Sequence, residues 1–207
     1  MFAQGDVVIE VNANRTKIED EDLSLVSGFT QMTDLSLEET ATGDTGLAHL
    51  PKLQKLEWLN LYRTRIGDEG LKHIRLLRNL RHLPVGETHV TDAGLAHLSD
   101  MEQLLYLGLR GNHITDDGVK HLRKLVKLTG LHLGGTKVTD AGVTHLLGMT
   151  SLEKLWLDET SVTDKAIPIL GKLTSLRDLH IAGTNITAEG FRRLTALLPE
   201  CHIENGP

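Results

Sequence analysis

Aromatic side chains are scarce in this sequence, where phenylalanine, tryptophan and tyrosine together make up only 3% of the 207 residues. A hydrophobic core must therefore be built from aliphatic side chains, which supply most of the 40% hydrophobic content. The single cysteine, Cys201, excludes an internal disulfide framework. We interpret Cys201 as part of a terminal cap, because no basic neighbour is evident that would activate its thiol.

An excess of positive charge and long apolar runs are also missing. The net charge of −6 argues against the basic stripe that recognition of DNA or RNA normally needs, so we expect no nucleic-acid partner. No run of about 18 or more apolar residues occurs, so we expect no membrane span. Residues 1–6 have neither the basic start nor the apolar stretch of a secretory signal peptide.

A constant 24-residue period organises nearly the whole chain. A degenerate first copy starts at Val8, and the first leucine position then recurs without a slip in register: Met32, Leu56, Leu80, Leu104, Leu128, Leu152 and Leu176. We interpret residues 1–207 as a single domain. It comprises an N-terminal cap (1–7), eight repeats (8–199) and a C-terminal capping strand (200–207).

Each repeat begins with the alternation of a short strand that has one buried face, as in Leu56-x-x-Leu59-x-Leu61. We expect strands near Asp34–Ser36, Trp58–Asn60, His82–Pro84 and their equivalents. Pro84 lacks an N–H, so one hydrogen bond between strands should be missing there. Stacked repeats would then share a continuous core.

The ninth position of each repeat carries a small polar side chain, which we expect to satisfy backbone groups of adjacent coils where the chain turns. These residues are Thr16, Thr40, Thr64, Thr88, Asn112, Thr136, Thr160 and Thr184.

A short helix is predicted next, with an aspartate as its N-cap. These aspartates are Asp44, Asp68, Asp92, Asp116, Asp140 and Asp164. Glycine recurs two residues later although it is a poor helix former, which suggests that neighbouring coils pass too closely for a side chain. These glycines are Gly46, Gly70, Gly94, Gly118, Gly142 and Gly190.

The pattern L-x-x-L-x-L-x-x-T-x-[IV]-T-D-x-G-[LV] resembles the cysteine-containing class of leucine-rich repeats found in F-box proteins, with threonine in the cysteine position. It looks closest to threonine-rich bacterial versions of that repeat, over about residues 8–199. The resemblance implies an α/β right-handed solenoid, or horseshoe, with a parallel sheet on the concave face and short helices on the convex face. It also implies partner binding without defining the partner. Many extracellular members carry disulfide-bonded caps, so the single cysteine favours a cytoplasmic protein over a secreted bacterial fragment.

The concave face is where we expect a partner to bind. The third, fifth and seventh positions of each strand point away from the core. All four Trp and Tyr residues fall there, and Trp, Tyr and Arg dominate binding hot spots. The predicted contact residues are Trp58, Tyr62, His82, Tyr106, Arg110, His132, Trp156 and His180. Between them lie small residues that we expect to leave low ground for the partner: Pro84, Gly86, Gly108, Gly130 and Gly134.

Three alternatives stay open at this point. The aromatic residues could simply stack across strands, the face could bind a saccharide or another small ligand, or the chain could be a structural spacer in a larger protein. A long unbroken surface would favour a protein or peptide partner, and a deep aromatic pocket would favour a small ligand. We expect a monomer.

Enzymatic and metal-binding functions are not favoured by the sequence. The only serine on the concave side, Ser36, lies far from His132 and His180, and an acid–base pair of His180 with Asp158 or Asp178 would have no nucleophile beside it. A histidine recurs at one helical position, but packed helices lie about 8–10 Å apart, too far for consecutive members to share an ion. We therefore predict packing histidines, no cofactor, no metal and no catalytic residue. The helical histidines are His49, His73, His97, His121 and His145.

Overall fold

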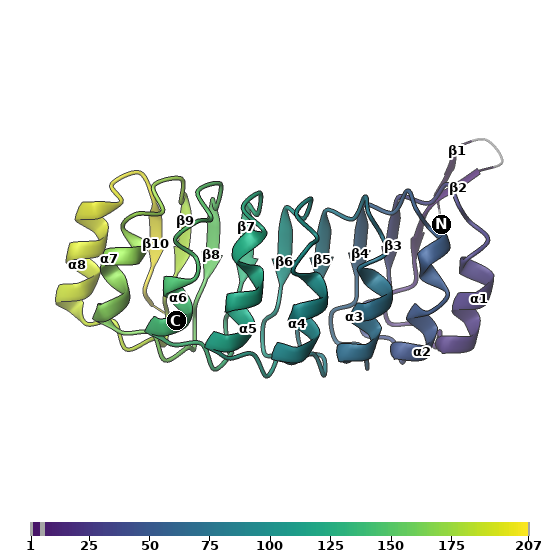
Figure 1. The fold of residues 1–207 in the computed structure, drawn as a ribbon, viewed down its shortest axis with the longest axis horizontal. Helices are drawn as coiled ribbons and strands as arrows, with labels where there is room; N and C mark the ends of the chain where they lie inside the picture. Colours follow the sequence, from purple (N-terminus) through teal and green to yellow (C-terminus); the bar gives the residue numbers. More distant parts are fainter. Residues whose placement is uncertain (1, 5–6, 207) are drawn as a thin grey trace.

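The computed structural model describes residues 2–4 and 7–206, and in this part of the chain ten strands form one sheet in sequence order. The strands stand side by side from one end of the molecule to the other, and the helices are stacked along one side of them (Figure 1). The strands are β1 (Phe2–Gln4), β2 (Val7–Asn12), β3 (Asp34–Ser36), β4 (Trp58–Asn60), β5 (His82–Pro84), β6 (Tyr106–Gly108), β7 (Gly130–His132), β8 (Lys154–Trp156), β9 (Asp178–His180) and β10 (His202–Glu204).

One short helical segment follows nearly every strand, as the repeat predicts. The α-helices are α1 (Leu23–Val26), α2 (Asp44–Leu47), α3 (Asp68–Ile74), α4 (Asp92–Leu98), α5 (Asp116–His121), α6 (Asp140–Thr144), α7 (Ile167–Leu170) and α8 (Ala188–Leu197). Four 3₁₀ turns accompany them, at Asp20–Asp22, Leu50–Lys52, Leu122–Lys124 and Asp164–Ala166. No helix in the described residues is long and apolar enough to cross a membrane.

The strands from β2 to β10 pair in parallel, and each step of the sheet advances the chain by 24 residues, as from Asp34 to Trp58. The predicted α/β solenoid with a parallel sheet and short helices is therefore confirmed. At the N-terminal edge, β1 adds an antiparallel strand that the sequence did not predict within its cap of residues 1–7. Strand β2 begins at Val7, the last residue of the predicted cap.

Pro84 weakens the sheet where the sequence predicted it. Strands β4 and β5 pair only at Trp58 and His82, whereas every other pair of adjacent parallel strands in the described sheet pairs over three residues. A proline nitrogen cannot donate to the neighbouring strand, so the ladder is interrupted at this step.

The core is aliphatic and runs through all the repeats. The three leucine positions of a repeat, for example Leu56, Leu59 and Leu61, are fully buried, and they join one continuous cluster from Ala13 to Leu198. Each coil buries its apolar face against the next coil, which is why a single repeat would not fold alone.

Contacts between coils explain why the spacing of aspartate and glycine recurs in the repeats. The predicted N-cap was wrong by one residue. From α4 to α6 the N-cap is a threonine such as Thr91, whose hydroxyl accepts a hydrogen bond from the N–H of Ala93. The aspartate is the first helical residue instead, and its carboxylate faces the next coil. Asp68 accepts hydrogen bonds from the backbone N–H of Thr91 at 2.8 Å and from its hydroxyl at 2.7 Å.

The recurring glycine is needed because this carboxylate fills the space beside it. A Cβ atom on Gly94 would lie 2.3 Å from Oδ1 of Asp68, so the predicted close approach of neighbouring coils is confirmed. In the seventh repeat Ala166 takes this position, and there the segment begins as a 3₁₀ turn rather than an α-helix.

The polar residue at the ninth position is buried in most repeats, but its bonding differs from the prediction. The hydroxyl of Thr64 donates to the carbonyl of Leu61 within the same coil, and the other threonines of the column do the same. Only the longer side chain of Asn112 reaches the preceding coil, where it donates to the carbonyl of Val85 and accepts from the N–H of Thr88. A threonine hydroxyl is too short to span the distance of about 4.8 Å between coils.

Candidate binding face

The face of the sheet that the helices leave uncovered is lined by three columns of side chains, one for each outward-pointing position. The register places His82 between Trp58 and Tyr106 in the first column. It places Trp156 between His132 and His180 in the second column. The third column carries Tyr62 and Arg110. All eight residues predicted from the sequence are therefore on this open face.

Trp156 is the centre of an aromatic stack. Its ring lies 5.2 Å from the His132 ring at an interplanar angle of 13° and 5.4 Å from the His180 ring at 21°. Tyr106 meets it edge-on, with ring centroids 6.3 Å apart. Because His132 and His180 come from the strands on opposite sides of β8, both faces of the indole are covered, and only its edge is open to a partner.

Trp58 has a different environment. It is 39% exposed, and within the described residues no other ring stacks on it. It borders a hollow of about 440 Å³ that is also lined by Asp34, His82, Pro84 and Tyr106. This hollow offers an indole face together with a proline and a tyrosine, which suits an apolar or aromatic group of a ligand.

Two further hollows lie beside this one on the open face. A middle hollow of about 230 Å³ shares the lining residues Pro84 and Tyr106 with the first, and a C-terminal hollow of about 670 Å³ shares Arg110 and His132 with the middle one. We call the three neighbouring hollows together the trough. The middle hollow is lined by Tyr62, Pro84, Gly86, Tyr106, Gly108, Arg110 and His132. The C-terminal hollow is lined by Arg110, His132, Trp156, Asp158, Glu159, His180, Ala182, Gly183, Glu204 and Gly206.

The glycines on this face make room mainly for neighbouring side chains, which corrects the expectation that all of them leave low ground. A Cβ atom on Gly130 would lie 2.8 Å from the ring of Tyr106, and one on Gly134 would lie 2.6 Å from the carboxylate of Asp158. These two positions are therefore already filled. Gly86 and Gly108 line the middle hollow, but a Cβ atom on Gly86 would lie 2.9 Å from the carbonyl oxygen of Arg110, and one on Gly108 would lie 3.1 Å from the Tyr106 hydroxyl.

Electrostatic contacts hold the C-terminal hollow together. Nδ1 of His180 lies 2.7 Å from the carboxylate of Glu204, so the acid–base pairing considered for His180 with Asp158 or Asp178 does not form. Asp178 instead lies 3.6 Å from Lys154. Asp158 faces Arg110, whose guanidinium is 3.7 Å from its Oδ2.

Burial keeps His132 uncharged at neutral pH. Desolvation in the stack lowers its pKa to about 4, although the nearby carboxylate of Asp158 opposes this shift. Its Nδ1 accepts a hydrogen bond of 3.1 Å from the backbone N–H of Gly134, which requires an unprotonated nitrogen. Burial also raises the pKa of the Tyr106 hydroxyl.

Tyr62 is fixed from two sides at the wall of the middle hollow. Its hydroxyl donates to the carboxylate of Glu87, and the guanidinium of Arg63 lies over its ring at 5.1 Å. Burial and this hydrogen bond raise the pKa of Tyr62. The hydrogen bond from Arg63 and, to a smaller extent, the one from Tyr62 lower the pKa of Glu87.

The rim beside Tyr62 is a column of residues with left-handed backbone, which the sequence analysis did not predict. Its members are Arg15, Glu39, Arg63, Glu87, Gly111, Gly135, Glu159 and Gly183. The first four alternate in charge and form ion pairs of 3.0, 3.2 and 2.6 Å along the rim. Each such exposed ion pair stabilises the fold only weakly. Together they link the side chains of the rim over the N-terminal half, whereas Gly111 and Gly135 place no side chain on the rim beside the middle of the trough.

Sequence reasoning considered Asp158 only as an acid–base partner of His180, and it missed Glu159 and Glu204 as residues of the C-terminal hollow. Glu204 could have been found, because it continues the column of His132, Trp156 and His180 by one more 24-residue step into β10. Asp158 is two residues beyond Trp156 on the same outward-facing side. The predicted contact residues were chosen as aromatic residues, histidines and an arginine, so they did not include these acidic residues.

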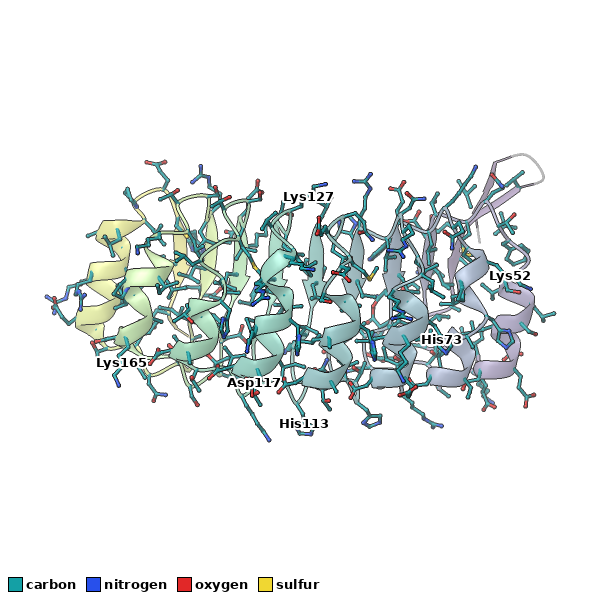
Figure 2. All side chains as sticks on the ribbon, viewed as in Figure 1. Lys52, His73, His113, Asp117, Lys127 and Lys165 are labelled. Atoms are coloured by element: carbon teal, nitrogen blue, oxygen red, sulfur yellow. The ribbon has the colours of Figure 1, made fainter. Side chains whose placement is uncertain are left out.

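The helical histidines lie on the opposite side of the molecule, where Figure 2 shows His73 among the side chains of the helix face. His49 and His121 are exposed, and the other three are half-buried. The structure places no group of three or more His, Cys, Asp or Glu side chains where they could hold a metal ion, within the residues it describes. The packing role of these histidines stays a prediction.

Comparison with known proteins agrees with this architecture. A family model described as "Leucine Rich repeat" matches residues 103–122 and 172–194. No curated protein matches the sequence significantly. The solved structure of internalin C2 from Listeria monocytogenes is 24% identical, covers 95% of this chain and 80% of that chain, and has a TM-score of 0.75. The chain has the leucine-rich-repeat fold.

Two other solved leucine-rich-repeat structures resemble this one. An internalin (inlF) from Listeria monocytogenes is 20% identical, covers 94% of this chain and 72% of that chain, and has a TM-score of 0.53. The ectodomain of the Arabidopsis receptor kinase HAESA, solved in complex with a peptide hormone ligand, is 17% identical with a TM-score of 0.75. It covers 99% of this chain and 35% of that one. The matching family model describes a structural repeat and no catalytic activity.

Proposed function

We propose that this chain is a non-enzymatic protein that binds an extended peptide, or an extended segment of another protein, in the trough on the open face of its sheet. The observation that carries the proposal is that the three hollows lie next to one another on the open face and have the lining residues Pro84, Tyr106, Arg110 and His132 in common. An elongated, open depression of this kind fits a chain that lies across several strands. A small ligand would need one enclosed pocket instead.

Trp58 is the residue best placed to contribute binding energy. Its exposed indole contributes little to the leucine core, so the exposed surface of the ring is free to contact a partner. Tyr62, Tyr106, Arg110 and the stack around Trp156 would line the path of the peptide. The eight residues predicted from the sequence are all proposed to contact it, with Trp58 as the anchor and Trp156 mainly as a wall.

A saccharide-binding function is less well supported. Sugar rings pack on the faces of aromatic side chains, and both faces of Trp156 are covered by His132 and His180. Only Trp58 would offer a free face, and one platform is a small site for a sugar chain. A pure spacer would not need a row of aromatic residues beside a hollowed face.

A display selection with random dodecapeptides on the purified chain tests the proposal. Peptides that bind should lose at least about 2 kcal/mol of binding free energy on the Trp58→Ala variant, as expected for a hot spot. Val126→Ala is the matched control, because Val126 is an exposed apolar residue outside the trough. If no selected peptide is sensitive to Trp58→Ala, the contact surface lies elsewhere.

We also propose that the repeats are the threonine-rich bacterial form of the cysteine-containing class, since the ninth-position threonine makes its hydrogen bond within its own coil. A hydroxyl that bonds locally fits the position of a small cysteine side chain. A monomeric, cytoplasmic protein without a nucleic-acid partner stays our prediction.

A further inference from the structure

The two ends of the trough differ in charge. The N-terminal hollow around Trp58 contains one carboxylate, Asp34, which accepts a hydrogen bond from the neighbouring Thr33. The C-terminal hollow contains three carboxylates, Asp158, Glu159 and Glu204, of which Glu204 is paired with His180 and Asp158 faces the single guanidinium of Arg110. With His132 uncharged, this end of the trough is acidic.

Asp158 is the least exposed of the three carboxylates of this hollow. Its side chain is only 16% exposed, and its ion pair with Arg110 is 3.7 Å long, beyond normal hydrogen-bond distance. A carboxylate that is largely removed from water gains from a donor placed close to it. Asp158 lines the hollow, where a donor from a ligand could reach it.

We propose that the C-terminal hollow binds a cationic group of the partner, the side chain of a lysine or arginine, through Asp158 with support from Glu159 and Glu204. This inference rests on the proposed peptide-binding function and gives it a sequence requirement. Charge complementarity is the reason, because a cation would bring the acidic hollow closer to neutrality. A partner that carries carboxylates would be repelled by this hollow.

The geometry of the sheet also fixes a spacing. Trp58 is at the third position of its repeat in β4, and Asp158 is at the seventh position of the repeat that contains β8. Four steps between strands of about 4.8 Å and four residues along a strand at about 3.3 Å each separate them by about 23 Å. An extended peptide covers this distance in about seven residues. The partner should therefore carry an apolar residue and a basic residue about seven positions apart.

The dodecapeptide selection gives the first test. Selected peptides should be enriched in lysine or arginine at about seven positions from an apolar or aromatic residue. Peptides that depend on Trp58 but show no such enrichment would overturn this inference and leave the proposed function standing. Peptides that do not depend on Trp58 at all would instead overturn the proposed function.

Paired peptides and charge variants give the decisive test. One selected peptide is made with its lysine and with norleucine in that place, and both are titrated by calorimetry. The preference for lysine should fall about tenfold on Asp158→Asn, the loss expected for one hydrogen bond to a charged group. It should rise on Arg110→Gln, which removes the competing cation, and stay unchanged on Glu153→Gln, an exposed carboxylate in the same repeat but outside the trough. An unchanged preference on Asp158→Asn, in a variant that melts like the parent chain, would overturn the proposal.

Discussion

The two tryptophans of the chain lie on the same open face, four strands apart and in different columns, and their environments differ. Trp156 is enclosed by His132 and His180 and touched edge-on by Tyr106, so it belongs to the structure of the sheet face. Trp58 is exposed beside a hollow without a stacked ring. The comparison shows that a large aromatic residue on a solenoid face can serve packing or recognition, depending on what stands in the neighbouring strands.

The largest expected effect that separates the two residues concerns stability. Trp156→Ala should lower the free energy of unfolding by about 2–3 kcal/mol, because it removes a half-buried ring and its stacking partners. Trp58→Ala should lower it by less than about 1 kcal/mol, since the side chain is exposed and does not fill the core. Urea unfolding of both variants at pH 7 measures these values. Equal losses would show that the two environments do not differ as described.

The pH dependence of stability should locate the same difference at His132. Its pKa falls from about 6.5 in the unfolded chain to about 4 in the folded chain, so the folded state favours the neutral form. Stability from this group is fully present above pH 6.5 and is lost as the pH falls towards 4, by roughly 1–3 kcal/mol. Urea unfolding at several pH values should show this loss, and His132→Gln should reduce it.

The matched control for this experiment is His82→Gln, on the same face but exposed. That variant should keep the pH dependence of the parent chain. If His132→Gln leaves the acid-side loss unchanged while His82→Gln removes it, burial of the imidazole in the Trp156 stack is not its cause.

A smaller effect is expected from filling the space under Tyr106. Gly130→Ala would place a Cβ atom 2.8 Å from the ring, so Tyr106 must shift and its edge contact with Trp156 must loosen. We expect a loss of about 1 kcal/mol and a changed near-ultraviolet circular dichroism signal. Gly148→Ala, where a Cβ atom meets nothing within 4 Å, is the control and should change neither property.

The smallest effect concerns Cys201 at the C-terminal end. Burial and the nearby Asp178 raise the pKa of its thiol to about 11, so almost no thiolate is present at neutral pH. Alkylation by iodoacetamide at pH 8 should therefore be at least about tenfold slower than for a cysteine in a short peptide. Equal rates would mean that the thiol is exposed and that its role as part of the cap is wrong.

The sequence predicted the parts of this molecule that repeat, and it predicted the single features of each coil less well. The strands and their register follow from periodicity, because each coil meets its neighbour in the same way, and the missing bond at Pro84 follows from the proline nitrogen, which cannot donate. The N-cap was predicted one residue too late. Asp68 is the first residue of α3, and its carboxylate contacts Thr91 at the start of α4; an N-cap and a first helical residue share the same preference for aspartate.

The candidate site was predicted only as a set of positions. Placing aromatic residues at the third, fifth and seventh positions puts them on one face, and the structure confirms this placement. Which of them stack could not be predicted, because it depends on side-chain rotation and on glycines such as Gly130 that admit a neighbouring ring. Asp158 was considered from the sequence only as a partner of His180, and its burial beside Arg110 could not be predicted because it depends on how the side chains pack.

The central claim is that a partner peptide occupies the trough and contacts Trp58, and the indole N–H signals of the chain test it most directly. With two tryptophans, a ¹H–¹⁵N spectrum contains two such signals, and Trp58→Phe assigns them. Titration with a peptide from the selection should move the Trp58 signal strongly and the Trp156 signal less. A peptide that binds by calorimetry while the Trp58 signal stays in place would contradict the account.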